Sequence, residues 1–311
     1  MTAAMNIAVI GECMIELQDK DGRLEQAFGG DTLNTATYLA RLTGEKDIST
    51  SYVTALGKDA FSRDMKASWD AEGIDTSLIL TVEDKQPGIY YIETDDTGER
   101  TFFYWRNDSA AKYLFEQADS AALVDKLMTF DAVYLSGITL AILTEAGREV
   151  LFNFLKAFSE KGGKVLFDNN YRPKLWENAE QAQQAYAHVL SCTDIALLTF
   201  DDEQDLYGDS DVEQCIERSL GMGVGELIIK RGSKDCLVVT EEKSEYVAPT
   251  LVKNVVDTTA AGDSFSAGFL AKRFTGGTAT QAAKAGHVMA GTVIQHKGAV
   301  IDRAVMPTIE L

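Results

Sequence analysis

Short apolar runs rich in β-branched residues alternate along most of this chain with longer amphipathic stretches, and this alternation limits the fold more than any other feature. It is typical of βα units arranged around a largely parallel sheet. We therefore predict one α/β layered domain that spans residues 1–311. Helices are expected at residues 31–42 and 59–72. The expected strands are residues 7–17, 51–56, 132–136, 164–168, 195–199 and 227–230.

The stretch from residue 78 to residue 106 differs because it has no helical pattern. Three short β-like runs occupy residues 78–82, 88–93 and 101–105, and residues 95–98 have the composition of a turn. We expect a β-meander outside the main sheet. Its aromatic residues would form a large exposed apolar patch, so we expect a lid over a ligand, a dimer surface, or both. These residues are Tyr90, Tyr91, Phe102, Phe103, Tyr104 and Trp105.

Composition and charge exclude several classes of partner. The formal net charge of -19 would repel nucleic acid, whose binding depends on Lys and Arg neutralising phosphates. No apolar run reaches the roughly 18 residues needed to cross a bilayer, and the amino terminus lacks a secretory signal pattern. The 4 cysteines have no paired spacing typical of a zinc site or a disulfide framework. We therefore expect a cytoplasmic protein without nucleic-acid or membrane partners.

The run of small residues that begins at Asp257 carries the strongest chemical signal. Ala260, Ala261 and Gly262 let backbone N–H groups converge before a helix, whose positive end completes an anion hole. Such a hole suits a phosphoryl group in transfer. Asp263 begins the helix, where a carboxylate either caps the helix or accepts a proton from an attacking hydroxyl. The spacing by itself leaves both roles open.

A second segment, residues 28–36, contains a pair of glycines before an expected helix. Gly29 and Gly30 let the backbone approach a ligand closely, and Asn34 on the first helical turn offers a donor and an acceptor to sugar hydroxyls. The alternative is a glycine turn followed by an Asp helix cap.

Both segments resemble signatures of the ribokinase-like (PfkB) carbohydrate kinases: residues 257–263 with the following Ala267 and Gly268, and residues 28–36. The resemblance implies a ribokinase-like, Rossmann-type layered domain with a central, mostly parallel sheet. It also implies a small β-sheet lid formed by segments near residues 12–28 and 78–106. Asp263 would be the catalytic base, and Ala260, Ala261 and Gly262 would hold the phosphate.

Residues 11–16, 90–93, 103–106 and 168–176 further resemble PfkB kinases of the sugar acid 2-keto-3-deoxygluconate. This implies ATP-dependent phosphorylation of the acid to its 6-phosphate, with Gly30 and Asn34 binding the substrate. A carboxylate is held well by a fork of guanidinium donors, so Arg106 and Arg172 are the expected anion clamp. Unremarkable surface arginines are the alternative. Tyr90 and Tyr104 would contact the acid from the lid, and packing within the ribbon explains them equally well.

The resemblance also implies a nucleotide site, and the absence of Gly-x-x-x-x-Gly-Lys excludes a P-loop. Magnesium is expected because it neutralises charge between the β- and γ-phosphates. The family's Asn-x-x-Glu is absent, and Asp201, Asp202 and Glu203 in that stretch are equally typical of a solvated helix start, so the metal's ligands stay undefined. The expected nucleotide-binding residues are Asn170, Thr199, Lys230, Arg231, Gly232 and His287.

Two other functions stay open at this point. One is a PfkB-type kinase of another sugar, such as fructose, and the other is a non-catalytic sugar-acid sensor on the same scaffold. The intact pair Gly262 and Asp263 favours a kinase, because a sensor need not keep a base aimed at a hydroxyl. The aromatic lid predicts a homodimer formed through it. Use of the galactonate epimer and dependence on a monovalent cation are left open by the sequence.

Overall fold

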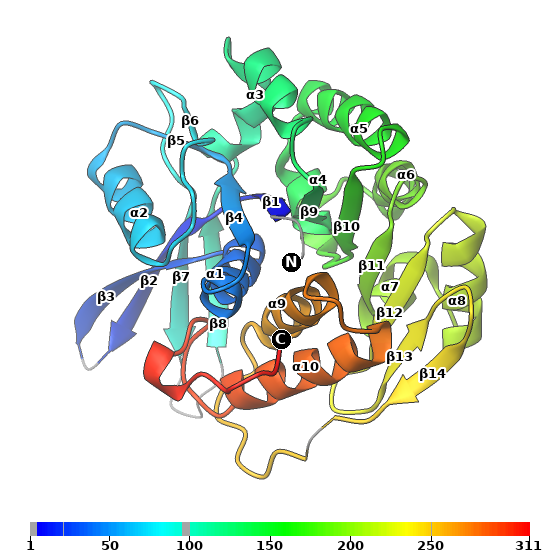
Figure 1. Ribbon diagram of the computed structural model, residues 1–311. Helices are drawn as coiled ribbons and strands as arrows, with labels where there is room; N and C mark the ends of the chain where they lie inside the picture. The colour runs from blue at the N-terminus through cyan, green and yellow to red at the C-terminus, as the bar shows by residue number, and fades with distance from the viewer. Residues whose placement is uncertain (1–4, 21, 95–99, 250) are drawn as a thin grey trace.

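The structure is a computed structural model that describes residues 5–20, 22–94, 100–249 and 251–311, so the turn expected at residues 95–98 lies outside the described residues. An eight-stranded sheet forms its centre, in the order β14-β13-β12-β11-β10-β9-β1-β4 (Figure 1). The neighbours among β12, β11, β10, β9, β1 and β4 pair in parallel, and β13 and β14 add an antiparallel edge. The strands are β1 (Met5–Ile10), β4 (Ile48–Val53), β9 (Ala132–Ser136), β10 (Lys164–Asp168), β11 (Ile195–Thr199), β12 (Glu226–Lys230), β13 (Cys236–Val239) and β14 (Ser244–Val247).

Helices cover both faces of this sheet, which is why a strand such as β9 is buried along its whole length. Successive residues of each strand enter opposite cores: Ala8 and Ile10 pack into one helix layer, whereas Ile7 and Val9 pack into the other. One layer contains α1 (Asp31–Thr43), α2 (Ala60–Ala71), α9 (Ala261–Phe274) and α10 (Ala279–Val293). The other contains α3 (Ser120–Leu127), α4 (Gly137–Ile142), α5 (Glu145–Glu160), α6 (Ala179–Leu190), α7 (Phe200–Tyr207) and α8 (Val212–Gly221).

Short 3-10 helices complete the chain: η1 (Ala110–Glu116), η2 (Pro173–Leu175) and η3 (Arg303–Val305). Within the described residues, no helix combines the length and the apolar character that a membrane span needs.

Four expected strands agree with the structure, because residues 132–136, 164–168 and 195–199 match β9, β10 and β11, and β12 begins one residue before the expected 227–230. The single strand expected at residues 7–17 is wrong. The chain leaves the main sheet after Ile10 because it passes close to α1, where a Cβ at Gly11 would lie 2.1 Å from Thr32 Oγ1. The strand expected at residues 51–56 is likewise divided into β4 and the short β5 (Ala55–Leu56).

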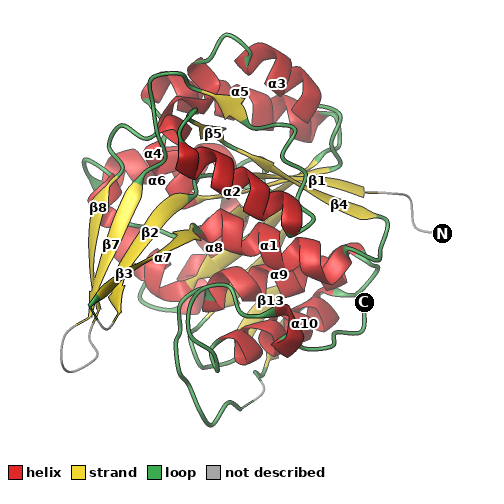
Figure 2. Ribbon diagram, turned by 90° about the vertical axis from the view of Figure 1, so that its left-hand side faces the viewer, coloured by secondary structure: helices red, strands yellow, loops and turns green. Residues whose placement is uncertain are grey.

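A separate four-stranded sheet, which we call the lid, stands beside the main sheet in the order β3-β2-β7-β8 (Figure 2). Its strands are β2 (Met14–Lys20), β3 (Arg23–Gly29), β7 (Ile89–Thr94) and β8 (Arg100–Trp105). It is not a simple meander, because two antiparallel hairpins join through the parallel pair β2 and β7. The strand expected at residues 78–82 is not part of it: β6 (Leu80–Thr81) pairs with β5, and the flanking Leu78 and Val82 are buried in the main core.

Candidate active site

Helix α9 begins next to the carboxyl ends of the parallel strands, where α/β folds usually bind ligands. The residue just before the helix, its N-cap Ala260, has a φ of 58°, a left-handed conformation that costs a residue with a Cβ about 1–2 kcal/mol. No side chain caps the helix there. Ala261 donates its amide to Thr258 O (3.2 Å), whereas the described contacts give no acceptor for the amides of Ala260, Gly262 and Asp263. This arrangement can receive an anion at the positive end of a helix.

Asp263 lies one residue further along α9 and is partly exposed. Asn34 Nδ2 of α1 donates a hydrogen bond to Asp263 Oδ2 (2.9 Å), which joins the two sequence motifs across 229 positions of the chain. Figure 1 shows α1 and α9 side by side on one face of the sheet. Asn34 Oδ1 is buried and has no hydrogen-bond partner among the described residues.

The surroundings of Asp263 favour its protonated form. Burial and the nearby carboxylates of Asp31 and Asp168 raise the pKa of Asp263 to about 7, against the opposing effects of the Asn34 hydrogen bond and the Lys230 charge. A carboxylate with a pKa near neutrality is suited to general-base catalysis, because it is both ionised and basic at physiological pH. The geometry therefore makes Asp263 more than a helix cap, since its side chain faces Asn34 and not the first amides of α9.

A buried charge pair lies beneath the start of α9. Lys230 Nζ at the end of β12 donates to Asp168 Oδ2 at the end of β10 (2.7 Å), and Ser266 Oγ of α9 donates to the same oxygen (3.0 Å). The ammonium lies close to Gly262, because a Cβ added to Gly262 would be 3.6 Å from Lys230 Nζ. One carboxylate oxygen thus holds the lysine and α9 in a fixed relation.

The loop after β10 connects both sides of the site. Asn169 donates to Thr199 O (3.0 Å) and accepts from Thr199 N (2.9 Å), which fixes the ends of β10 and β11 against each other. Asn170 has a positive φ of 27° and donates to Asp31 Oδ2 (2.6 Å) at the start of α1. The structure therefore places Asn170, an expected nucleotide ligand, next to the residues expected to bind the acceptor.

The two arginines expected to form an anion clamp have different surroundings. Arg106 is paired with Glu12, and both side chains are almost fully buried, at 8% and 1% exposure. Arg172 is 51% exposed, and its nearest carboxylate oxygen, Asp202 Oδ1, is 3.5 Å from Nη1. In this structure Arg172 is the arginine whose guanidinium is accessible, whereas the charge of Arg106 is already neutralised.

The lid tyrosines differ in the same way. Tyr90 is buried and its hydroxyl donates to Glu16 of the neighbouring strand, while its ring lies 5.9 Å from that of Tyr104. Tyr104 is exposed on the edge strand β8. The structure brings both into one aromatic row on the lid.

The other expected nucleotide residues lie at the carboxyl ends of β11 and β12 and on α10. Thr199 ends β11, and Arg231 Nε donates to Asp235 O (2.8 Å) while its guanidinium covers the ring of Tyr246. Gly232 has a φ of 61°, which favours glycine. His287 is nearly buried, contacts Phe265 edge-on and hydrogen-bonds Val247 O (3.0 Å). Burial lowers the pKa of His287, so this imidazole is neutral.

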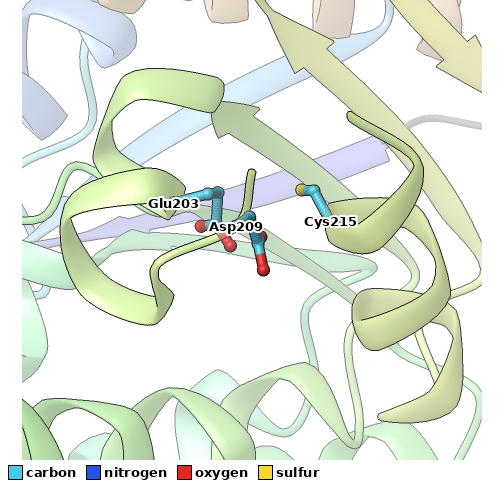
Figure 3. Close-up of side chains that lie close together, drawn as sticks. All are labelled: Glu203, Asp209 and Cys215. Carbon is cyan, nitrogen blue, oxygen red and sulfur yellow. The ribbon is translucent and has the colours of Figure 1, made fainter. Parts of the chain in front are cut away.

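Three potential metal ligands in the described chain lie close together on and between α7 and α8. They are Glu203, Asp209 and Cys215 (Figure 3). Arg218 already supplies the cation there, because its guanidinium donates to Glu203 Oε2 (2.6 Å) and to Asp209. Burial also raises the pKa of Cys215 to about 12, which keeps the thiol protonated and unfit as a ligand. The group therefore stabilises the fold. Glu203 is thereby committed to Arg218 and Asn169, whereas Asp202 is partly exposed at the site.

Sequence reasoning missed three carboxylates that shape the site: Glu12, Asp31 and Asp168. All three stood within segments that resemble the family signatures, which was the available signal. Their roles depend on partners far away in the chain, and such partners leave no mark on the local pattern.

A lidded α/β fold with an anion hole and a basic carboxylate beside it defines a small-molecule kinase. More particularly, the chain belongs to the pfkB family of carbohydrate kinases, whose model matches residues 4–305. It is 53% identical over 305 residues to a 2-dehydro-3-deoxygluconokinase of Dickeya dadantii, covering 97% of this chain and 98% of the relative. The identity to the enzyme of that name from Escherichia coli K12 is also 53%, over 304 residues, with the same coverage. The crystal structure of aminoimidazole riboside kinase from Salmonella enterica with aminoimidazole riboside and an ATP analog has the same fold. Its TM-score is 0.82 at 23% identity, covering 97% of this chain and 96% of that one.

Proposed function

We propose that this protein transfers the γ-phosphoryl group of ATP to the 6-hydroxyl of 2-dehydro-3-deoxy-D-gluconate. The observation that carries the proposal is the position of Asp263, a carboxylate with a pKa raised to about 7 beside an anion-receiving helix start. The 53% identity to 2-dehydro-3-deoxygluconokinases over nearly the full chain supports the choice of acceptor.

In the proposed reaction Asp263 removes the proton of the 6-hydroxyl as the oxygen attacks the γ-phosphorus. The new bond joins the 6-oxygen to phosphorus, the bond from phosphorus to the bridging oxygen of the β-phosphate breaks, and ADP leaves. Little covalent chemistry falls to the protein, so positioning and charge neutralisation supply most of the rate. The Gly262 amide, the positive end of α9 and the nearby Lys230 ammonium would stabilise the charge of the transferring group.

The acceptor would lie between α1 and the lid. Gly30 packs against the backbone of Glu12, since a Cβ there would lie 2.2 Å from Glu12 O, and it would border the acceptor through its own backbone. Asn34 Oδ1, which lacks a partner in the described chain, would accept a hydrogen bond from a sugar hydroxyl. Arg172 would bind the carboxylate, because its guanidinium is accessible. Arg106 would join it only if the acid displaces Glu12, so its contribution to the clamp is the smaller one.

ATP would bind over the carboxyl ends of β11 and β12. Thr199 and Lys230 are opposite each other there in neighbouring strands, and Arg231 and Gly232 follow Lys230 in the chain. Magnesium, if bound with ATP, would neutralise negative charge on the phosphates. The sequence left the metal's ligands undefined among Asp201, Asp202 and Glu203. Of these, Asp202 would hold the ion, because its carboxylate is a hard oxygen ligand, is partly exposed and lies beside the loop after β10. Since the donor is ATP, we propose the cytoplasm as the location.

We also propose a homodimer formed through the lid. Edge strand β8 exposes Phe103 and Trp105 on one face, and the latter is 62% exposed. An unpaired strand edge with such side chains is a natural surface for a second copy of the chain.

The test is an assay of ADP release with a panel of acceptors. It should contain 2-dehydro-3-deoxy-D-gluconate, its galactonate epimer, fructose and ribose, each with and without Mg²⁺. We expect kcat/KM for the acid to exceed that for the neutral sugars by at least about 10²-fold, since a site built to pair with a carboxylate leaves its own charged group unpaired when a neutral sugar binds. Equal or better use of fructose would identify a fructokinase. Tight binding of the acid without ADP release would identify a sensor.

A further inference from the structure

One ion pair joins the lid to the loop that carries the anion hole. Arg100 on edge strand β8 donates from Nη2 to Asp257 Oδ1 (2.8 Å) and from Nη1 to Asp257 Oδ2 (3.1 Å). The two residues are 157 positions apart. Their side chains are 32% and 9% exposed, so the pair is partly shielded from solvent. A two-pronged contact of this kind has a defined geometry, unlike most surface ion pairs.

Asp257 also organises the chain that follows it. Its Oδ1 accepts from the amide of Thr259 (2.9 Å) and from Thr259 Oγ1 (2.7 Å), and its Oδ2 accepts from the amide of Gly298 (3.0 Å). Thr259 immediately precedes Ala260, the residue with positive φ that turns the chain into α9. Asp257 therefore fixes the entry to the anion hole and ties it to the segment after α10.

The charge of Asp257 is well stabilised. Burial acts to raise the pKa of Asp257, but the hydrogen bonds from Arg100, Thr259 and Gly298 outweigh it and hold the pKa well below its usual range. The carboxylate is therefore ionised at neutral pH. The pair consequently acts through geometry and not through titration.

Position distinguishes this contact from a simple tether for the lid. A tether would serve equally well at any point where the lid meets the main domain. Arg100 instead contacts the one carboxylate that orients the anion-hole loop, six residues before Asp263. Lid closure and loop order are therefore linked by the same oxygen atoms.

We propose that Arg100 and Asp257 are positioning residues for phosphoryl transfer: Arg100 holds the lid closed and, through Asp257, holds the anion-hole loop in its transfer-competent conformation. This inference rests on the kinase activity proposed above, but not on the identity of the acceptor. Closed lids exclude water from kinase sites, so a loosened lid admits water as a competing acceptor. In that side reaction water takes the place of the hydroxyl, and the products are ADP and inorganic phosphate.

The experiment measures two rates for each variant: phosphoryl transfer to the preferred acceptor, and inorganic phosphate release during that transfer. The variants are Arg100→Ala, Arg100→Lys, Asp257→Asn and the double variant Arg100→Ala with Asp257→Asn. Arg23→Ala is the matched control, because Arg23 is an exposed arginine on β3, the opposite edge strand of the lid.

For Arg100→Ala we expect kcat to fall about tenfold, the scale of coupling between contacting charged residues, while the ratio of hydrolysis to transfer rises by a similar factor. Arg100→Lys should recover part of both effects, and Arg23→Ala should change neither. Adding Arg100→Ala to Asp257→Asn should have little further effect, because the two residues act as one unit.

An unchanged ratio of hydrolysis to transfer in Arg100→Ala would overturn the proposal, as would an undiminished effect of that substitution in the Asp257→Asn background. Thermal unfolding of each variant separates loss of fold from loss of function, and Arg100→Ala alone tests the idea if Asp257→Asn fails to fold. If the wild-type chain transferred phosphate to no acceptor of the panel, the kinase proposal would fail first, and the two failures are thus distinct.

Discussion

Asp263 is a residue whose function depends on charges supplied by other parts of the chain. Asp31 and Asp168 raise its pKa, Asn34 orients its carboxylate, and Lys230 limits the rise. The local sequence, an aspartate at a helix start, is also that of an ordinary cap. Its neighbours in space raise its pKa to about 7, and the proposed role of Asp263 as the base depends on that shift.

The first prediction concerns Asp263→Asn. We expect kcat to fall by about 10²- to 10⁴-fold, the range for loss of a general base, with nearly unchanged ATP affinity. The measurement is single-turnover kinetics together with nucleotide titration. Asp59→Asn is the control, because Asp59 caps α2 through the amide of Ser62 and an asparagine caps equally well. Near-wild-type turnover in Asp263→Asn would exclude the residue as the base.

The second prediction is the pH dependence that follows from the raised pKa. Below a pH of about 7, kcat/KM should fall as Asp263 takes up a proton, which gives the pH profile an acidic limb. Asp31→Asn should move this acidic limb to lower pH, because it removes a negative charge that raises the pKa of Asp263. A limb that stays in place in Asp31→Asn would show that another group titrates.

The raised pKa of Asp263 also makes the stability of the fold depend on pH. An unfolded aspartate has a pKa of about 3.9, so between this value and about 7 the folded chain binds a proton that the unfolded chain has lost. The contribution of Asp263 to stability therefore falls as pH rises through this window. Asp263→Asn should raise the melting temperature more at pH 8 than at pH 5.5, measured by calorimetry in matched buffers.

The third prediction tests the acid clamp. Arg172→Ala should raise KM for the sugar acid at least about tenfold, the usual cost of losing one charged hydrogen-bonding partner, with little change in kcat or in KM for ATP. Lysine keeps the charge without the fork, so Arg172→Lys should recover only part of the affinity. An unchanged KM in Arg172→Ala would remove the residue from the clamp.

At the scale of elements, α9 depends on close contact with α10. A Cβ at Gly268 would lie 2.8 Å from Ala285 O, and one at Gly286 would lie 2.8 Å from Phe265 O. The two helices thus approach each other through glycine on both sides. This contact fixes the direction of α9 and, with it, the position of its amino-terminal end at the site.

The fourth prediction follows from this contact. Gly268→Ala should destabilise the fold by about 1–3 kcal/mol, the usual cost of overpacking, because backbone must move to admit the methyl group. Gly221→Ala at the end of α8 is the control, since no atom lies within 4 Å of the added Cβ there. Denaturant unfolding of both variants makes the comparison. Equal stability of Gly268→Ala and the wild type would mean that the helices can separate freely.

At the scale of the whole molecule, the lid is both a cover for the site and an exposed surface. Its inner contacts, such as that between Arg100 and Asp257, bind it to the main domain. Its edge strand leaves Phe103 and Trp105 in solvent. A second copy of the chain that covered this edge would also restrain the lid.

The fifth prediction concerns this edge. If the chain dimerises through the lid, Trp105→Arg should give a monomer, because a charge replaces a buried aromatic anchor at the centre of the interface. Light scattering on a sizing column measures the mass. Phe61→Arg is the control, because Phe61 is exposed on α2, which is not part of the lid. A dimer that persists in Trp105→Arg would place the interface elsewhere.

The βα order of the main sheet and the position of the α9 motif could both be predicted from the order of the residues alone. Strands covered on both faces leave continuous apolar runs, and β9, β10 and β11 could be placed to the residue. The anion-hole motif was readable for a related reason, because a helix start that receives an anion needs small residues in sequence. Local signals of this kind are present in any short window of the chain.

The way in which distant residues combine could not be predicted, because it depends on contacts that form when the chain folds. The break after Ile10 depends on the approach of Thr32, and the pairing of β6 with β5 depends on the burial of Leu78 and Val82. The raised pKa of Asp263 and the buried ion pair between Arg106 and Glu12 also depend on partners that folding brings together. The energies of these interactions depend on the distance between two residues in the folded chain. The pattern of hydrophobicity along the sequence does not record that distance.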